Sequence, residues 1–360
     1  MPDKTILIMA GGTGGHIYPA LAVADYLKEQ GFKLFWLGTE KGLEKRVVPE
    51  HGYSLLTIQV SGVRGKGVIK LCIMPFMLLF AIWQALLIML KIKPTAVLGM
   101  GGFASGPGGI AAWLLRIPLL IHEQNAIAGI TNKLLSRFAC RIMAAFPNAF
   151  KQQDKLLITG NPVREDIMNI DSPEERFKHR NGEPLNILVL GGSLGAASLN
   201  ERVPEAIALL SDCKISIRHQ CGPKHSKSTF AKYEQLNLQA EVLPFIEDMA
   251  VEYSWADIVI CRAGALTIAE LATVGVGSIL VPFPFAVDDH QTANATYLEN
   301  GGAAIIMQQS QMTAETIKQC LSDFCQSYQR CIDMAVNARK LAKPKATRSV
   351  AEACMEVAYA

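Results

Sequence analysis

The feature that most constrains this chain is a glycine-rich turn that follows its first apolar run. Thr5–Ile8 is apolar, and the next nine residues, Met9–Ile17, read MAGGTGGHI. An apolar run that ends in glycines and then becomes amphipathic is typical of a buried strand, a tight turn and a helix N-terminus. Glycines let a backbone approach a ligand closely, and a helix N-terminus offers unpaired N–H groups to an anion. The stretch therefore predicts a phosphate-binding loop with His16 in the first helical turn; the alternative is an ordinary turn with a surface histidine.

A similar pattern returns in the second half of the chain and predicts two domains. Leu185–Leu190 is apolar and is followed by the glycine turn Gly191–Gly195 and a helical stretch. Apolar strands alternate with amphipathic helices in both halves, which predicts parallel sheets with right-handed crossovers. A chain of 360 residues is also longer than one typical core supports. We therefore expect an α/β fold of two Rossmann-like domains that face each other across a cleft.

The expected N-terminal domain spans residues 1–163, and the expected C-terminal domain spans residues 164–345. Residues 171–184 are polar, charged and bounded by prolines, which is typical of a linker. The last helix, residues 346–360, lies beyond Lys343-Pro344-Lys345 and is expected to pack back on the first domain.

The distribution of charge and the cysteine content indicate what kind of surface or ligand the chain meets and in which compartment it works. Lys and Arg outnumber Asp and Glu by 18 to 8 in residues 1–164, whereas 17 stand against 24 in residues 165–360. This asymmetry indicates that the first half meets an anionic surface or ligand. The nine cysteines show no C-x-x-C pair or metal-ligand spacing, and no signal peptide opens the chain. This favours reduced thiols in the cytoplasm.

One segment is apolar enough to interact with a membrane. Leu71–Leu90 reads LCIMPFMLLFAIWQALLIML and is flanked by lysines on both sides. As a helix it would be about 30 Å long, enough to cross a bilayer. The alternation of strands and helices resumes directly afterwards, and one sheet cannot have strands on both sides of a membrane. We favour a helix with one face on the sheet and the other in the membrane interface; a wholly buried core helix and a true span are the alternatives.

Polar residues follow the apolar strands at two further places. Residues 119–125 read LLIHEQN, so His122, Glu123, Gln124 and Asn125 come at a strand end, where ligands of open α/β sheets bind. Arg262–Thr267 follows another strand, and Glu270, one turn further on, is placed to accept hydrogen bonds from a ribose diol. A match to the dinucleotide fingerprint at Gly99–Ala104 is weak evidence by itself.

Together, seven motifs make this chain similar to the MurG family of bacterial peptidoglycan glycosyltransferases, the undecaprenyl-diphospho-muramoylpentapeptide β-N-acetylglucosaminyltransferases. The resemblance covers essentially the whole chain, and the motifs occur in the same order at matching spacing: GGTGGH, GGFASGPGG, HEQNA, GNPVR, GGSLGA, RAGALT-x-x-E and HQ-x-x-NA. It implies a GT-B fold and an inverting transfer of N-acetylglucosamine from UDP-N-acetylglucosamine to the muramoyl 4-hydroxyl of lipid I, giving lipid II and UDP.

The resemblance also implies partners and site residues. The expected partners are UDP-N-acetylglucosamine, lipid I and an anionic membrane surface at the cytoplasmic face of the inner membrane, with no nucleic acid. The expected base is His16, because histidine ionises near neutral pH, with Glu123 as a rival base or an orienter. The donor is expected at Thr13, Gly14, Gly15, Asn125, Arg164, Ser193, Ile246, Ala265, Leu266, Thr267, Ile268, Ala269, Glu270 and Gln291. The acceptor diphosphate is expected at Gly11, Gly12, Gly14, Gly15, Gly101, Gly102 and Ser105. Membrane contacts are expected at Lys66, Lys70, Ile73, Phe76, Leu79, Phe80, Trp83 and Lys91.

Helix N-termini and hydroxyls are expected to stabilise the leaving group, with no metal and no cofactor. Asp288 and Asp289 are adjacent and do not form the spaced Asp-x-Asp of metal-using transferases. His290 departs from the glutamine expected in many members. Three alternatives are open: a UDP-N-acetylglucosamine 2-epimerase of the same fold, an NAD-dependent dehydrogenase and a non-enzymatic membrane scaffold. The first gives no reason for the basic, apolar flank of the first domain.

Overall fold

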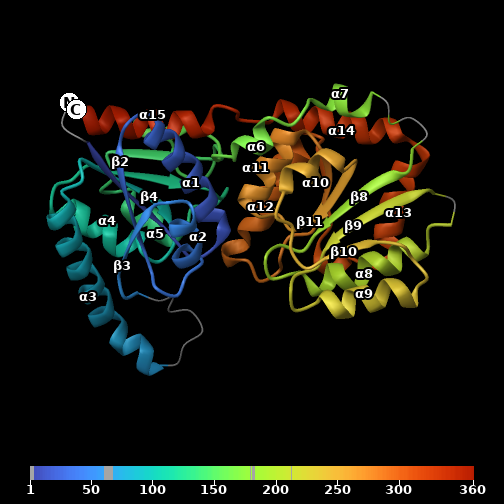
Figure 1. The fold of residues 1–360 in the computed structure, drawn as a ribbon, viewed down its shortest axis with the longest axis horizontal. Helices are drawn as coiled ribbons and strands as arrows, with labels where there is room; N and C mark the ends of the chain where they lie inside the picture. Colours follow the sequence, from blue (N-terminus) through green and yellow to red (C-terminus); the bar gives the residue numbers. More distant parts are fainter. Residues whose placement is uncertain (1–3, 61–67, 179, 181–182, 212) are drawn as a thin grey trace. The chain divides into compact units, whose positions relative to one another are not determined.

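The structure is a computed structural model, which describes residues 4–60, 68–178, 180, 183–211 and 213–360. The chain divides into two compact units (Figure 1). Unit 1 contains Met1–Arg164 and Pro344–Ala360, and unit 2 contains Glu165–Lys343. Each unit is a parallel sheet with its own helices, so the α/β class expected from the alternating pattern is confirmed.

The sheet of unit 1 has seven strands in the order β3-β2-β1-β4-β5-β6-β7. All neighbouring pairs are parallel. The order reverses between β1 and β4, and such a reversal marks where ligands of open α/β sheets bind. The strands are β1 (Thr5–Ala10), β2 (Lys33–Gly38), β3 (Ser54–Thr57), β4 (Ala96–Gly101), β5 (Leu119–Glu123), β6 (Arg141–Ala144) and β7 (Leu156–Ile158).

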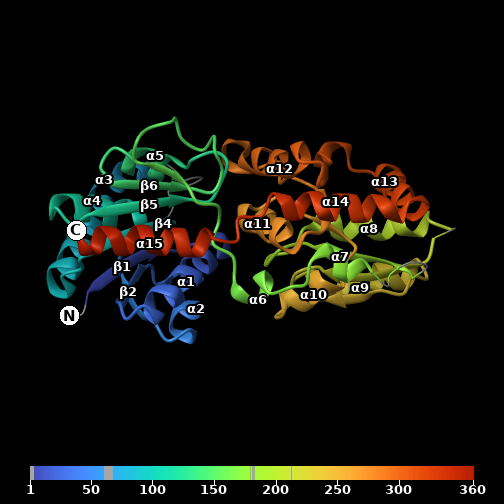
Figure 2. The same ribbon diagram turned by 90° about the horizontal axis from the view of Figure 1, so that it is seen from above.

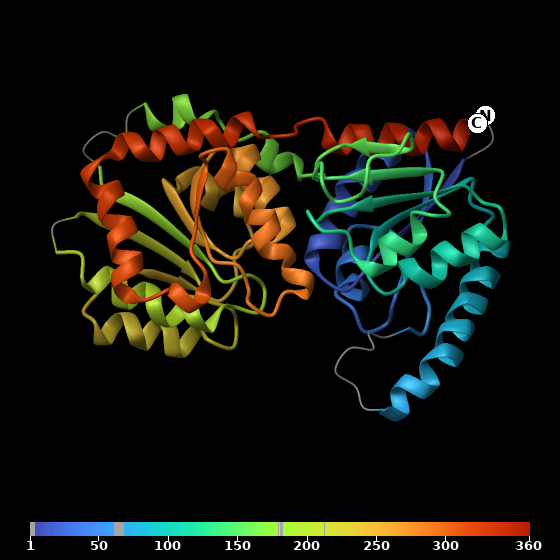
Figure 3. The same ribbon diagram turned by 180° about the vertical axis from the view of Figure 1, so that it is seen from behind.

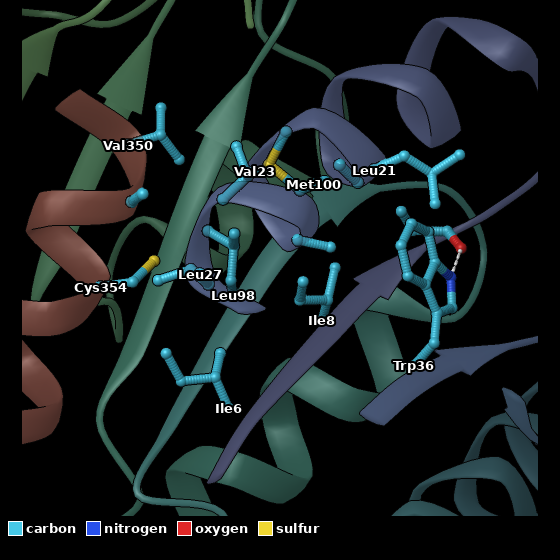
Figure 4. Close-up of a cluster of buried hydrophobic side chains, with 14 of the residues drawn as sticks. Ile6, Ile8, Leu21, Val23, Leu27, Trp36, Leu98, Met100, Val350 and Cys354 are labelled. Atoms are coloured by element: carbon cyan, nitrogen blue, oxygen red, sulfur yellow. Dashed lines mark hydrogen bonds between the residues drawn. The ribbon is translucent and has the colours of Figure 1, made fainter. Parts of the chain in front are cut away.

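The described residues of this unit form the helices α1 (Gly14–Glu29), α2 (Glu44–Glu50), α3 (Val68–Ile92), α4 (Ser105–Leu114), α5 (Ile130–Leu135) and α15 (Ala346–Tyr359). The C-terminal helix α15 packs against α1 and β4 (Figure 2). Figure 4 shows Val350 and Cys354 of α15 in the same core as Ile6 of β1 and Leu27 of α1. A second core, on α3 and α4, includes Leu7, Val97 and Ala111.

Helix α3 is exposed over most of its described length. Only Ala81, Ala85 and Met89 are fully buried, and they recur every four residues on one face. Phe76 is 73% exposed, and 17% of the apolar stretch Ile73–Ile92 is buried. By length and composition alone this helix could cross a membrane. The alternative of a wholly buried core helix is therefore wrong, because the helix rests on unit 1 by one narrow stripe of small side chains and Met89.

The sheet of unit 2 has six parallel strands in the order β10-β9-β8-β11-β12-β13, with its reversal between β8 and β11. They are β8 (Leu185–Leu190), β9 (Ile215–Gln220), β10 (Glu241–Leu243), β11 (Ile258–Cys261), β12 (Gly277–Leu280) and β13 (Ala304–Ile306). Helix α13 packs on α8, and α14 packs on α11 and β12 (Figure 3). The helices are α6 (Glu165–Met168), α7 (Pro173–Phe177), α8 (Ala197–Ala208), α9 (Ser226–Gln235), α10 (Met249–Trp255), α11 (Ala265–Val274), α12 (His290–Asn300), α13 (Ala314–Gln326) and α14 (Tyr328–Lys340), with 3-10 turns η1 (Val287–Asp289) and η2 (Gln309–Gln311).

Two expectations from the sequence are corrected in unit 2. The described part of the expected linker 171–184 belongs to unit 2: Pro173 and Phe177 of α7 are buried, and the Arg176 guanidinium donates to the carbonyls of Tyr253, Val274 and Gly275. The expectation of reduced thiols also fails at one place, because Cys213 and Cys325 form a disulfide across 112 residues of sequence. Sequence spacing could not predict this pair, since only the packing of α13 brings the two cysteines together.

Candidate active site

The two glycine loops of unit 1 meet at the point where its strand order reverses. The first follows β1 and the second follows β4, and β1 and β4 are neighbours. Gly12, Gly101 and Gly102 have φ of 89°, 104° and 85°, a region that favours glycine. A Cβ on Gly102 would lie 2.3 Å from the carbonyl oxygen of Gly11. The loops therefore touch backbone to backbone, which only glycine allows here.

His16 stands beside this junction in the first turn of α1. Its ring packs against the second loop, because a Cβ on Gly101 would lie 2.7 Å from its Nδ1. Nδ1 is 2.9 Å from Oε1 of Gln124, the residue that follows β5. The ring of His16, on the helix that follows β1, is thus held by Gly101 at the end of β4 and by Gln124 after β5, and the interpretation as a plain surface histidine is wrong.

Gln124 continues into a chain of buried hydrogen bonds. Its Nε2 is 3.0 Å from Nδ1 of His122, and Nε2 of His122 is 3.0 Å from the carbonyl oxygen of Gly160. His122 is fully buried, and burial lowers the pKa of its imidazole to about 4. His122 is therefore neutral near pH 7. Gln124 and His122 belong to the strand-end cluster that the sequence singles out, but their link to His16 was not predicted.

The side chain of Glu123 is buried, and its carboxylate accepts several hydrogen bonds. Its carboxylate accepts hydrogen bonds from the backbone N–H groups of Asn125 and Gly129 and from the side-chain amides of Asn125 and Asn132, at 2.9–3.1 Å. The side chain is 2% exposed. These four hydrogen bonds tie the loop after β5 to α5. This arrangement fits the orienting role better than that of a base.

Glu44, the first residue of α2, is a buried carboxylate that the sequence did not bring forward. It is 0% exposed and accepts from Gly12 N at 2.9 Å, Thr39 N at 2.9 Å and Thr39 Oγ1 at 2.7 Å. A Cβ on Gly11 or Gly42 would lie 2.5 or 1.9 Å from its carboxylate oxygens. The absence of a Cβ at Gly11 and Gly42 thus makes room for Glu44, whose carboxylate holds the first loop by its hydrogen bond from Gly12 N.

Other residues expected in unit 1 take different positions. Ser105 is fully buried, and its hydroxyl accepts from Gly101 N and lies 2.7 Å from Gly101 O. Its hydroxyl faces the backbone and holds the second loop, and its expected contact with the acceptor diphosphate stays a prediction. Thr13 is exposed and caps α1 with extended backbone, and Arg164 stacks 5.5 Å from the ring of Tyr18.

In unit 2 the expected donor residues gather at the carboxyl ends of β8 and β11, again where the strand order reverses. Ser193 is exposed in the glycine turn after β8. Helix α11 begins at Ala265, so its first turn holds Ala265, Leu266 and Thr267. Glu270 is 6% exposed and accepts from the Tyr253 hydroxyl at 3.0 Å. Glu270 is therefore not a solvated residue of the helix surface.

The remaining donor candidates follow other strands of the same sheet. Ile246 is buried after β10, and Oε1 of Gln291 in α12 accepts from Phe283 N at 2.9 Å. Arg262 donates to Val281 O, Ser198 Oγ and Gln309 Oε1. It joins β11 to three other segments of unit 2. The sequence pointed to this residue only as part of a motif. Ile268 and Ala269 lie within α11, where Ile268 is fully buried.

The membrane residues expected on α3 are exposed where they are described. Leu79, Phe80 and Trp83 are 64%, 44% and 54% exposed, and Ile73 and Lys91 are exposed as well. Lys66 lies outside the described residues, and only the helical backbone of Lys70 is described. Sequence reasoning missed two aromatic residues: Trp113 on α4 is 50% exposed and contacts Phe138, with ring centres 4.8 Å apart. Helix α4 packs on both α3 and α5.

Comparison with known proteins identifies the family. Residues 6–144 match the glycosyltransferase family 28 N-terminal domain, and residues 186–352 match the glycosyltransferase family 28 C-terminal domain. The chain belongs to glycosyltransferase family 28. It is 48% identical over 358 residues, 99% of this chain and 98% of the relative, to the UDP-N-acetylglucosamine–N-acetylmuramyl-(pentapeptide) pyrophosphoryl-undecaprenol N-acetylglucosamine transferase of Marinobacter nauticus.

Solved structures agree with this assignment. MurG of Acinetobacter baumannii is 46% identical, with a TM-score of 0.85 over 98% of this chain and 99% of that one. The expected membership in the MurG family and the GT-B fold class are thereby confirmed. A UDP-GlcNAc 2-epimerase of Neisseria meningitidis, bound to UDP-GlcNAc, has a TM-score of 0.69 at 12% identity, over 98% of this chain and 100% of that one. At that identity the likeness to the epimerase concerns the fold alone.

Proposed function

We propose that this chain transfers N-acetylglucosamine from UDP-N-acetylglucosamine to the muramoyl 4-hydroxyl of lipid I, giving lipid II and UDP in peptidoglycan synthesis. One observation carries the proposal. In a chain nearly half identical to these transferases over its full length, His16 stands at the strand-order reversal of unit 1, against a glycine loop. Ligands of open α/β sheets bind at such a reversal of strand order. A histidine at that position is well placed to act as the base in a glycosyl transfer.

His16 is assigned the role of general base. The acceptor O4 attacks the anomeric carbon of N-acetylglucosamine, and a ring nitrogen of His16 takes the hydroxyl proton. The bond from the anomeric carbon to the UDP oxygen breaks, and UDP leaves with the electron pair. Attack opposite the leaving group inverts the anomeric carbon. Glu123 orients the loop after β5 and thereby Gln124, which contacts His16.

The nucleotide is assigned to unit 2. The start of α11 aims backbone N–H groups at a diphosphate, and a helix N-terminus stabilises the negative charge that develops on the leaving group. Glu270 accepts hydrogen bonds from the ribose diol, and Tyr253 holds its carboxylate in place. Ser193 completes the diphosphate contacts, Ile246 binds the uracil through its backbone, and Gln291 is proposed to bind sugar hydroxyls. Asn125 of unit 1 is likewise proposed as a contact of the sugar. Thr13, Gly14, Gly15 and Arg164 are the donor contacts proposed from unit 1.

The acceptor diphosphate is assigned to the glycine loops of unit 1, at Gly11, Gly12, Gly14, Gly15, Gly101 and Gly102. A Cβ on Gly12 would meet nothing within 4 Å, so the backbone is open to a ligand at this residue, and the N-terminus of α1 lies within the first loop. An undecaprenyl diphosphate is anionic and membrane-bound, which agrees with the excess of basic residues in residues 1–164.

We assign membrane contact to the α3–α4 patch, defined as Phe76, Leu79, Phe80, Trp83 and Trp113. All five are at least 44% exposed, on two helices that pack against each other, and so much exposed apolar surface marks an interaction site. With exposed Lys91 and Arg116 nearby in sequence, the patch suits the interface of an anionic bilayer, so that the enzyme acts peripherally at the cytoplasmic face of the inner membrane. Replacing Phe76, Phe80 and Trp83 by serine is expected to weaken sedimentation with anionic vesicles at least several-fold. Phe230→Ser, on unit 2, is the matched control, and equal binding of both variants would refute the assignment.

The transfer itself is tested with UDP-N-acetylglucosamine labelled in the sugar and a lipid I analogue. The expected products are UDP and a β-linked disaccharide lipid. His16→Ala is expected to lower kcat roughly 100-fold or more, the range of a positioned base. His51→Ala, an exposed histidine of the same unit, serves as the control. Conversion of UDP-N-acetylglucosamine to its 2-epimer without acceptor, or full activity of His16→Ala, would overturn the reaction or the base assignment respectively.

A further inference from the structure

We infer that Gln124 and His122 dictate which ring nitrogen of His16 carries the proton, and that they leave Nε2 as the basic atom. Gln124, which the proposed function names only as a contact of His16, and His122, which it does not use, thus act as positioning residues for the base. The role of Nε2 in catalysis rests on the proposed function, whereas the proton pattern is a property of the folded chain and can be measured without substrate.

The buried end of the hydrogen-bond network lies at the backbone carbonyl of Gly160. The carbonyl oxygen of Gly160 can only accept, so Nε2 of His122, 3.0 Å away, must carry a proton. Burial keeps this imidazole neutral near pH 7, because it lowers the pKa of His122 to about 4. A neutral imidazole carries one N–H only. Nδ1 of His122 is therefore a lone pair and must accept.

Because Nδ1 of His122 must accept, the orientation of the Gln124 side-chain amide is fixed as well. Its NH₂ group must face Nδ1 of His122, 3.0 Å away, and it also lies 3.4 Å from the carbonyl oxygen of His122. The amide oxygen is then the atom that faces His16, 2.9 Å from Nδ1. Since that oxygen can only accept, Nδ1 of His16 must donate, and the lone pair of neutral His16 is on Nε2.

The opposite amide orientation is excluded by the same partners. If the amide were turned over, its oxygen would face both the Nδ1 lone pair and the carbonyl oxygen of His122, two acceptors in a buried site. A buried polar group without a hydrogen-bond partner is destabilising, so this orientation is disfavoured. The main chain of Gln124 is also fixed, because Asn161 donates to its carbonyl at 3.0 Å. The donor-to-acceptor direction of these hydrogen bonds is thus set by the Gly160 carbonyl and imposed on His16 through the side chains of His122 and Gln124.

This pattern is useful to a base for two reasons. A neutral imidazole in water prefers to carry its proton on Nε2, so the network reverses the usual preference and keeps Nε2 ready to accept. When Nε2 takes the proton of the acceptor hydroxyl, Nδ1–H still donates to the amide oxygen, whose partial negative charge stabilises the imidazolium. No second proton has to move.

The decisive measurement is nitrogen NMR of the full chain labelled with ¹⁵N-histidine, recorded near pH 8. The chain has seven histidines, and the His16 signals are identified by their loss in His16→Gln. We expect a protonated, pyrrole-type Nδ1 and an unprotonated, pyridine-type Nε2 for His16. The reverse pattern in the unmodified chain would overturn the inference, whatever the variants do.

Two variants test the transmission. Gln124→Leu removes the acceptor of His16, and His122→Phe leaves Gln124 present but releases its amide to turn over. Both are expected to shift His16 toward Nε2–H, and the second does so without touching His16. His219→Phe is the matched control: His219 is a fully buried histidine of unit 2, bonded to Tyr233 and Asn200, and its loss should leave the His16 signals unchanged.

Kinetics separate this inference from the proposed function. Gln124→Leu is expected to lower kcat about 10-fold or more, a part of the roughly 100-fold or greater effect of a positioned base, with the KM for UDP-N-acetylglucosamine within twofold. A raised KM with unchanged kcat would contradict the positioning role. If the unmodified chain forms no lipid II while His16 shows Nδ1–H, the proposed function fails and the proton pattern stands. If lipid II forms and His16 shows Nε2–H, this inference alone fails.

Discussion

Glu44 offers a sharp test of how the first glycine loop is held. Its carboxylate is fully buried and accepts three hydrogen bonds, two at Oε1 from Thr39 and one at Oε2 from Gly12 N. Glu44→Gln keeps the shape of the side chain but has only one acceptor oxygen. If that oxygen stays with Thr39, the new NH₂ group faces the N–H of Gly12, so two buried donors oppose each other.

The expected cost follows from these contacts. Losing a hydrogen bond to a charged group removes about 1.5–3 kcal/mol, and a buried donor left unsatisfied costs about 1–3 kcal/mol. Because the two figures describe overlapping effects, we expect Glu44→Gln to lower the free energy of unfolding of unit 1 by about 2–4 kcal/mol. The loop should also lose its fixed place beside His16, so kcat should fall with it.

Urea unfolding followed by tryptophan fluorescence is the assay. Three of the four tryptophans lie in unit 1, and Trp36 donates to the carbonyl of Ala10, next to the loop, so the signal reports mainly on this unit. Glu50→Gln is the control, because Glu50 lies on the same helix and forms only an exposed ion pair with Arg46. Such a pair contributes about 0–1 kcal/mol. Equal midpoints for the Glu44 and Glu50 variants would refute the reasoning.

Three further predictions concern other parts of the molecule. Gly102→Ala should abolish most activity and lower the melting temperature, because its Cβ would lie 2.3 Å from Gly11 O; Gly52→Ala, with φ of 76° but nothing within 4 Å, should cost only the backbone strain of about 1–2 kcal/mol. Glu270→Ala should raise the KM for UDP-N-acetylglucosamine about 10-fold or more, and an unchanged KM in steady-state kinetics would remove its ribose role. His122 has a pKa of about 4 in the folded chain against 6.5 ordinarily, so the unfolded chain binds more protons between these values. Its contribution to stability is thus complete above pH 6.5 and falls by about 2 kcal/mol between pH 7 and pH 5; denaturant titrations should show a smaller loss for His122→Phe.

Local patterns in the sequence were enough for the fold class and for the first loop. The apolar run, the glycines and the amphipathic helix after them are neighbours in the chain, and their spacing alone specifies a strand, a turn and a helix start. The same logic predicted the strand end that carries His122 and Glu123. It failed at residues 171–184, because a polar composition does not exclude a short helix whose few apolar side chains find a core.

What the sequence by itself determined, then, is each strand–turn–helix module and the residue types at its loop. Only the tertiary structure decided which loops meet. His16 and Gln124 are 108 residues apart, and they touch because β1, β4 and β5 are laid side by side in the sheet. Glu44 reaches Gly12 through a space that glycines leave empty, and Cys213 meets Cys325 through the packing of a helix. Strand order and helix packing depend on long-range burial of apolar surface, which no local spacing encodes.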